Sequence, residues 1–239
     1  MTTVSPLAFA AKRRYFPNPA QGTLDGIVAM GDDLNAETLL EAYSFGIFPW
    51  PHPEMPCLWF CPDERGVLDF DHLYFNRSLQ KFLRHTDLKV TFNQQFEAVI
   101  RECASSPRPG QTSTWITEPV VRAYCDFHRM GYAHSVEVWR DQKLVGGVYG
   151  VYVGGSFSGE SMFYRESNAS KLALVTLIQS LKASGLKWLD IQMVTPLTEQ
   201  LGGIYVKKAE FLQRLEEVKK SAPIVLELNP IDQTHFQKY

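Results

Sequence analysis

Two short segments of the chain carry polar side chains of the kind that act on an amine or an ester. Residues 154–171 read GGSFSGESMFYRESNASK and place one carboxylate, Glu160, among small and aromatic residues. Residues 187–192 read KWLDIQ, which predicts a short apolar strand bearing Asp190 and Gln192. Because side chains two positions apart on a strand share a face, both polar groups point to one place. The two motifs together indicate a site for acyl transfer.

The same three residues also have ordinary structural interpretations. An aspartate at a strand end often caps the following turn, and a glutamine there often faces water. A buried glutamate is often satisfied by backbone donors. The residues alone leave these interpretations of Asp190, Gln192 and Glu160 open.

Apolar spacing and capping residues predict the elements that position these groups. Helices are expected at 36–45, 77–85, 94–104, 118–130, 169–184, 195–200 and 207–220, and strands at 133–140, 143–153, 156–163 and 188–193. Asn35, Asn93 and Thr117 are the expected N-caps of three of these helices. Gly46 ends the first helix, because glycine readily takes the left-handed conformation found there.

The chain divides into two predicted domains. Residues 1–64 are rich in proline, glycine and aromatic residues and predict a small N-terminal α/β domain. Within it, the four prolines of FPWPHPEMP exclude helix and hold Trp50 on extended backbone. Residues 65–239 combine a run of strands with helices, which predicts an α+β domain with a mixed, largely antiparallel sheet.

Composition restricts the class of protein. The chain has 239 residues, 45% of them hydrophobic, and no apolar run approaches the roughly 20 residues that span a bilayer. The N-terminus has no basic segment before its short apolar stretch, so we expect a cytoplasmic protein with no membrane partner. The net charge of −2 gives no general sign of nucleic acid. No apolar helix seam is evident, so a monomer is expected.

The four cysteines, at positions 57, 61, 103 and 125, are too few for a disulfide framework and fit free thiols. Cys57 and Cys61 lie near two histidines, but a structural zinc site needs four ligands at recognisable spacing. We expect no metal and no cofactor.

Two further motifs complete a family pattern. They are YSFGIFPW at 43–50 and TWITEPVVRAY at 114–124. With these and the first two motifs, the chain from about residue 16 to 212 resembles leucyl/phenylalanyl-tRNA-protein transferase. The resemblance implies transfer of Leu or Phe, and of Met as a further donor, from the 3′ ester of aminoacyl-tRNA. The acceptor is the α-amine of proteins beginning with Arg or Lys, which this step marks for degradation by the N-degron pathway.

The resemblance also implies a fold and a set of roles. The fold is GNAT-like, an antiparallel sheet that leads into a strand–helix–strand unit. Asp190 and Gln192 form the catalytic centre, and Glu160 binds the aminoacyl α-amino group. Because a neutral amide is a very weak base, we expect Gln192 to orient the amine and Asp190 to stabilise charge. A route for the proton through the ribose 2′-hydroxyl is equally open.

The remaining implied residues bind the tRNA end. Trp50 and Trp115 lie near the terminal adenosine, where stacking on a base contributes about 1–3 kcal/mol. Sequence alone equally allows the two tryptophans to anchor the interface between the two halves. A pocket for the Leu or Phe side chain is lined by Val148, Phe157, Met162, Leu174, Leu177 and Leu189, each of which could also be ordinary core.

Cations and acids near the site complete the predictions. Lys171, Lys207 and Lys208 are expected to contact phosphates of the acceptor stem. Glu118, Glu137 and Glu166 are candidates for the acidic subsite of the acceptor, with no choice among them.

Two other functions compete with this one. An acyl-CoA-dependent N-acyltransferase would need a glycine-containing pyrophosphate loop, and the corresponding YRESNASK has no glycine. A non-catalytic module that binds aminoacyl-tRNA or peptide would have no need of both Asp190 and Gln192.

Overall fold

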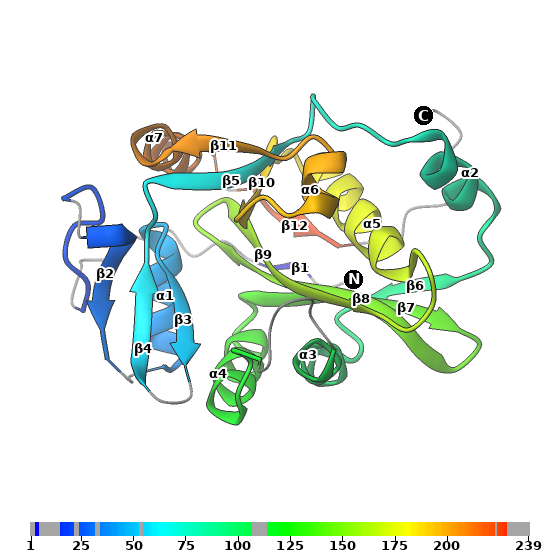
Figure 1. Ribbon diagram of the computed structural model, residues 1–239, viewed down its shortest axis with the longest axis horizontal. Coiled ribbons are helices and arrows are strands. Elements are labelled where there is room, and N and C mark those ends of the chain that lie inside the picture. The colour runs from blue at the N-terminus through cyan, green and yellow to red at the C-terminus, as the bar shows by residue number, and fades with distance from the viewer. Residues whose placement is uncertain are drawn as a thin grey trace.

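A seven-stranded sheet forms the centre of the protein in the computed structural model, which describes residues 3–4, 15–21, 24–31, 34–52, 55–106, 114–222 and 224–228 (Figure 1). The strand order is β11-β5-β10-β9-β8-β7-β6. All neighbours are antiparallel except β9 and β10. The strands are β5 (Glu64–Asp69), β6 (Lys89–Phe92), β7 (Ala133–Arg140), β8 (Lys143–Val153), β9 (Ser156–Tyr164), β10 (Trp188–Gln192) and β11 (Ile204–Lys207).

Helices cover both faces of this sheet. The long helix α5 lies on one face, and α3 and α4 lie on the other (Figure 1). Since α5 connects β9 to its parallel neighbour β10, these three elements form a strand–helix–strand crossover. The helices are α2 (Arg77–His85), α3 (Phe96–Ser105), α4 (Glu118–Arg129), α5 (Ala169–Ala183), α6 (Pro196–Gln200) and α7 (Lys208–Lys220). Two short strands, β1 (Thr3–Val4) and β12 (Leu226–Glu227), pair with each other.

A smaller N-terminal unit lies beside α4 and α7. It comprises β2 (Ile27–Met30), α1 (Ala36–Ser44), β3 (Phe48–His52) and β4 (Met55–Phe60), after the 3-10 turn Leu24–Gly26. The strands form a sheet in the order β2-β4-β3. Asn35 caps α1 as predicted: its side chain accepts hydrogen bonds from the backbone N–H groups of Glu37 and Thr38.

Two hydrophobic cores hold these layers together. The first contains Leu39 and Trp59 of the N-terminal unit together with Phe96, Tyr124 and Tyr149 from the helices and sheet. The N-terminal unit therefore shares a continuous core with the larger part of the chain. The second core lies between α5, α2 and the opposite face of the sheet.

Most predicted elements form, with small shifts at their ends. The start of α3 differs from the prediction. The helix begins at Phe96, and Asn93 does not cap it. Asn93 has a left-handed backbone (φ 58°), and its side-chain oxygen accepts from the backbone N–H of Ser135 at 3.0 Å. The predicted cap was wrong because Asn93 fixes β7 instead. Thr117 precedes α4, but its side chain makes no capping hydrogen bond.

All four cysteines are free and buried, as the sequence predicts. Within the described parts of the chain, no helix has the length and apolar character needed to cross a bilayer.

The glycines that end α1 and α5 form a matched pair for a stability test. Gly46 (φ 74°) and Gly185 (φ 99°) both follow the cap residue of a helix, but a Cβ on Gly46 would lie 2.6 Å from the Phe211 ring, whereas one on Gly185 meets nothing within 4 Å. We expect Gly185→Ala to lower the free energy of unfolding by about 1–2 kcal/mol through backbone strain alone. Gly46→Ala should lower the free energy of unfolding by the same strain and by about 1–3 kcal/mol more, because its Cβ would also overpack against Phe211. Chemical denaturation of both variants measures the difference, and equal losses would show that α7 does not pack tightly on this turn.

Candidate active site

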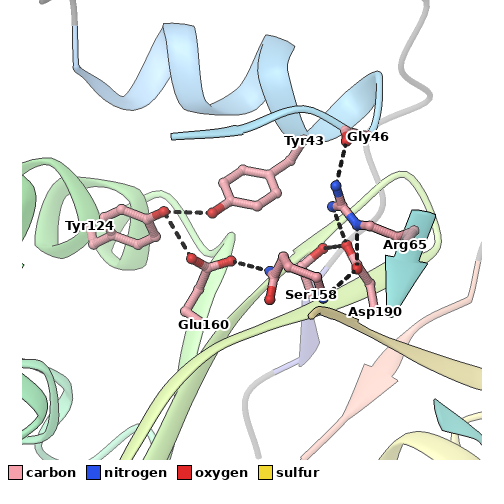
Figure 2. A network of polar contacts seen from close by, with 8 residues as sticks. Tyr43, Gly46, Arg65, Tyr124, Ser158, Glu160 and Asp190 are labelled. Atoms are coloured by element: carbon pink, nitrogen blue, oxygen red, sulfur yellow. Dashed lines mark hydrogen bonds and ion pairs between the residues drawn. The ribbon is translucent and has the colours of Figure 1, made fainter. Parts of the chain in front are cut away.

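A buried ion pair joins neighbouring strands at the centre of the large sheet. Arg65 on β5 donates from Nε and Nη2 to the two carboxylate oxygens of Asp190 on β10, each at 2.7 Å (Figure 2). The Asp190 oxygens also accept from the hydroxyl of Ser158 at 2.8 Å and from the backbone N–H of Gln192 at 3.1 Å. The two charged side chains are only 1% and 2% exposed. Asp190 is thus a carboxylate whose oxygens are fully occupied by donors.

The other side of the guanidinium faces the N-terminal unit. Arg65 Nη1 donates to the carbonyl of Gly46 at 3.1 Å. The guanidinium also lies over the ring of Phe48 at 4.6 Å and over that of Phe211 at 4.5 Å. Burial disfavours the charged form, but the charge and hydrogen bonds of Asp190 raise the pKa of Arg65 above its ordinary value. Arg65 is therefore charged.

Gln192 reaches the site through a bulge in β10. Asp190 pairs with Val67 of β5, and Gln192 pairs with the next residue, Gly66. The backbone of Gln192 is left-handed (φ 53°), a conformation that costs a non-glycine residue about 1–3 kcal/mol. The regular strand period predicted from sequence is interrupted here. Asp190 and Gln192 nevertheless meet, because Asp190 binds the turned backbone N–H of Gln192.

Glu160 on β9 connects Gln192 to two tyrosines. One carboxylate oxygen accepts from Nε2 of Gln192 at 3.0 Å, and the other accepts from the hydroxyl of Tyr124 at 3.2 Å. The Tyr124 hydroxyl is 2.5 Å from that of Tyr43, which extends from α1 of the N-terminal unit (Figure 2). The structure therefore brings the three predicted polar residues of the site into one network.

The surroundings of Glu160 shift its ionisation. Burial is the main reason that the pKa of this carboxyl is raised from 4.5 to about 7, and the nearby hydroxyl of Tyr43 opposes the rise. The charge of Asp190 also raises the pKa, while Tyr124 and Arg65 lower it. Burial also raises the pKa of both tyrosines well above 10.0, so their hydroxyls stay protonated. Glu160 is thus a carboxyl group that changes charge near neutral pH.

The two predicted tryptophans contact each other. Trp50 on β3 and Trp115, just before α4, stack with ring centroids 6.1 Å apart and an interplanar angle of 19°. Both pack on the first hydrophobic core and both are partly buried. They therefore join the N-terminal unit to the start of α4. Since the rings are already in contact, a nucleotide base could stack only on an outer face; that role stays a prediction.

The predicted pocket residues lie in and beside the second core. Five of them, Val148, Phe157, Leu174, Leu177 and Leu189, are at most 2% exposed. Met162 is partly buried and packs against the same core. Their role as walls of a side-chain pocket stays a prediction, and Met162 is the member nearest the surface.

Two of the three predicted tRNA-binding lysines already have acidic partners. Lys207 pairs with Glu64 and Lys208 with Asp63, each at 2.6 Å. Lys171 lies in the first turn of α5 and is partly buried. The charge available for phosphate at Lys207 and Lys208 is therefore reduced.

The three acidic candidates for the acceptor subsite also have partners. Glu118 pairs with Arg101 and Glu166 with Arg140. Glu137 is fully buried in β7 and accepts hydrogen bonds from hydroxyls of neighbouring residues. Of the acids considered from sequence, Glu160 is the one that lies beside both Asp190 and Gln192.

Comparisons with known proteins identify the family. A family model described as leucyl/phenylalanyl-tRNA protein transferase matches residues 67–216, and the model of its N-terminal domain matches residues 32–63. A protein of this name from Pseudoalteromonas atlantica is 44% identical over 225 residues, which cover 93% of this chain and 92% of that protein. The chain belongs to the leucyl/phenylalanyl-tRNA protein transferase family. The transferase is an aminoacyltransferase, as the sequence motifs predicted.

Other matches agree on the family. The transferase of Anaeromyxobacter dehalogenans strain 2CP-C is 48% identical over 210 residues, covering 88% of this chain and 90% of that protein. A solved structure of a functionally unknown conserved protein from Staphylococcus epidermidis is 11% identical with a TM-score of 0.41, covering 60% of this chain and 57% of that one. This last likeness is too low to carry an argument about the transferase.

Sequence reasoning missed four residues of the network: Arg65, Ser158, Tyr43 and Tyr124. The two tyrosines lie at the ends of the motifs YSFGIFPW and TWITEPVVRAY, so their place in those motifs was a usable signal. Ser158 lies in the same motif as Glu160. Arg65 had no local signal, because its carboxylate partner is 125 residues away in the chain.

The transferase is expected to bind a proton at Glu160 near neutral pH. Tyr124→Phe removes a hydrogen bond to the carboxylate and should raise the Glu160 pKa further above about 7. Carboxyl-carbon NMR titration measures this, and Glu160→Gln identifies the resonance. Tyr152→Phe is the control, because the Tyr152 hydroxyl donates to the carbonyl of Ile224 and not to Glu160. A Glu160 resonance that titrates near 4.5 would contradict the burial argument.

The raised pKa of Glu160 also predicts how the free energy of unfolding changes with pH. The folded-state pKa exceeds that of the unfolded chain, so the folded transferase binds the additional proton between about pH 4.5 and 7. The contribution of Glu160 to the free energy of unfolding therefore falls as pH rises through this window. Glu160→Gln should remove this loss of stability, and denaturant titrations of both proteins at about pH 4.5 and pH 7 measure it.

Proposed function

We propose that the chain transfers Leu or Phe, with Met as a further donor, from aminoacyl-tRNA to the N-terminal α-amine of proteins that begin with Arg or Lys. This transfer would mark them for the N-degron pathway. Beyond the family match, the observation that carries the proposal is the Glu160–Gln192 pair at 3.0 Å. It offers an acceptor for an ammonium group and an amide that can orient an amine.

The reaction needs orientation more than proton chemistry. The acceptor nitrogen attacks the ester carbonyl, a C–N bond forms, and the bond to the 3′-oxygen of the ribose breaks. The nitrogen loses a proton and the 3′-oxygen gains one. Because the α-amine has a pKa of roughly 7.7–8.0, part of it is already neutral near physiological pH. Holding the two reactants together lowers the barrier to this step.

Gln192 and Glu160 divide the binding of the two amines. Gln192 donates from Nε2 to Glu160, and no hydrogen bond to its carbonyl oxygen is present among the described residues. That oxygen can accept an N–H of the attacking amine. In its ionised form Glu160 binds the aminoacyl α-ammonium group through charge. Its raised pKa makes this binding stronger as the pH rises through about 7.

Asp190 contributes through Gln192 in this proposal. We expected Asp190 to stabilise charge at the reacting amine, but its oxygens accept from Arg65, Ser158 and the Gln192 backbone. No carboxylate oxygen is left to take the amine's proton. Asp190 is therefore a positioning residue, and the proton leaves through the ribose 2′-hydroxyl or a water molecule.

The proposal extends to the fold and to tRNA binding. The crossover from β9 through α5 to the parallel strand β10, within an otherwise antiparallel sheet, supports a GNAT-like domain at 65–239 after a domain at 1–64. Trp50 and Trp115 would stack on the terminal adenosine, with the pocket reached past Met162. Lys171 is the predicted phosphate contact with no ion-pair partner among the described residues. The protein would act as a cytoplasmic monomer.

A transfer assay tests the proposal. The wild type should move radiolabelled Leu from Leu-tRNA to a protein with N-terminal Arg, and acetyl-CoA should give no product. Gln192→Ala should lower kcat by about 10²-fold, the loss typical of one orienting hydrogen bond. Gln213→Ala is the matched control, because Gln213 makes a similar bond to Glu217 at 2.9 Å on the exposed face of α7. Absence of Leu transfer, or acetyl transfer instead, would reject the proposed function.

A further inference from the structure

All three guanidinium nitrogens of Arg65 donate hydrogen bonds, and they bind two elements that are far apart in the chain. Nε and Nη2 bind Asp190 on β10, and Nη1 binds the carbonyl of Gly46, at the end of α1. The planar guanidinium fixes the angles between these bonds, which a lysine could not do. Arg65 therefore sets the position of α1 relative to β10.

The Asp190 side of this arrangement leads to Gln192. Asp190 accepts the backbone N–H of Gln192 at 3.1 Å, which holds that residue in its left-handed conformation (φ 53°). The side chain of Gln192 then reaches one oxygen of Glu160. The position of the Gln192 amide therefore depends on an Asp190 carboxylate that Arg65 orients.

The Gly46 side leads to Tyr43. The backbone N–H of Gly46 donates to the carbonyl of Tyr43 at 3.2 Å, so both lie in the same closing turn of α1. Tyr43 meets the Tyr124 hydroxyl, which binds the other oxygen of Glu160. The two hydrogen-bonded arms that hold Glu160 thus start from one guanidinium.

We infer that Arg65 is a positioning residue for aminoacyl transfer, which ties the Gln192 arm and the Tyr43 arm of the Glu160 network to a single point. The inference rests on the proposed function for its kinetic consequences. Stability alone does not call for this pair: buried ion pairs can often be replaced by apolar residues without loss, and the Phe48 and Phe211 rings already surround the group. What an apolar replacement could not keep is the direction of the three hydrogen bonds.

The chain contains a matched control for this pair. Arg214 on α7 binds Asp69 on β5 at 2.7 Å, and both side chains are about one-fifth exposed (23% and 21%). This ion pair joins α7 to β5, and within the described residues neither partner is hydrogen-bonded to the Glu160 network. Arg65→Lys and Arg214→Lys therefore compare the effect of losing the planar guanidinium inside the site with its effect outside the site.

The kinetic test measures kcat, KM and thermal stability together. Arg65→Lys should lower kcat by about 10²-fold, as misplacement of reacting groups does, with KM changed less than about threefold. Arg214→Lys should leave kcat unchanged. In a Gln192→Ala background, Arg65→Lys should cost much less than in the wild type, because one of the two arms through which Arg65 acts is already gone. Full kcat in a folded Arg65→Lys protein, or losses that simply multiply in the double variant, would overturn the inference.

A second variant separates loss of positioning from loss of the folded structure. Arg65→Met with Asp190→Met removes both charges, so no unpaired charge is buried, and the protein should melt within a few degrees of the wild type while losing transfer. If this variant keeps full kcat, Arg65 does not position the site.

An activity-free measurement separates this inference from the proposed function. Arg65 lowers the pKa of Glu160, so Arg65→Met should raise that pKa. The other groups that face Glu160 stay in place: the charge of Asp190 raises the pKa, and the hydroxyls of Tyr43 and Tyr124 lower it. Arg214→Met should leave it unchanged. The NMR titration reports this even if the wild type transfers no Leu; an unchanged Glu160 pKa in Arg65→Met would contradict the shared anchor.

Discussion

The buried ion pair between Arg65 and Asp190 constrains the strands, the N-terminal unit and the residues of the candidate site together. Removing two charges from water is costly, and the cost is offset only when every charged atom has a well-placed partner. Here the carboxylate has four donors and the guanidinium has two acceptors and two aromatic faces. Meeting these requirements fixes β5, β9 and β10 side by side and brings the end of α1 onto them. The geometry of the site follows from that arrangement.

One consequence is that hydrogen bonds within the protein itself hold the side chains of the site in place. Glu160 is bound on both oxygens, by Gln192 and by Tyr124, and its pKa lies near 7. Asp190 has no oxygen left to act as a base. An activated ester and a partly neutral amine require little proton chemistry, so a site that mainly orients two amines would be sufficient for the transfer that we propose.

Local signals explain why much of the fold could be predicted. The helix at 77–85 and the strands at 133–140 and 143–153 form at the expected residues, because caps and alternation act within a few positions. Strands β5 and β6 were not predicted, since their stability comes from neighbours in the sheet. Asn93 was assigned to a cap but binds β7, 42 residues away. Contacts of this length leave no pattern in the nearby sequence.

The candidate site was predictable to a similar extent. Sequence motifs indicated Glu160, Asp190 and Gln192, and the family match confirms the type of enzyme. The bulge that turns Gln192, and the arginine that orients Asp190, depend on pairings across the sheet and were not predicted. Pocket residues could not be separated from core residues, because both are apolar and follow the same periodicity.

A structure with a bound donor analogue would show whether Glu160 holds the aminoacyl amine while Asp190 stays paired with Arg65. An adenosine that carries phenylalanine as a 3′-amide resembles the donor ester but is not cleaved. We predict that its α-amino group lies within about 2.6–3.2 Å of a Glu160 oxygen, with Asp190 still bound to Arg65 and Ser158. An analogue whose amino group displaces Arg65 from Asp190, or which binds away from Glu160 and Gln192, would contradict it.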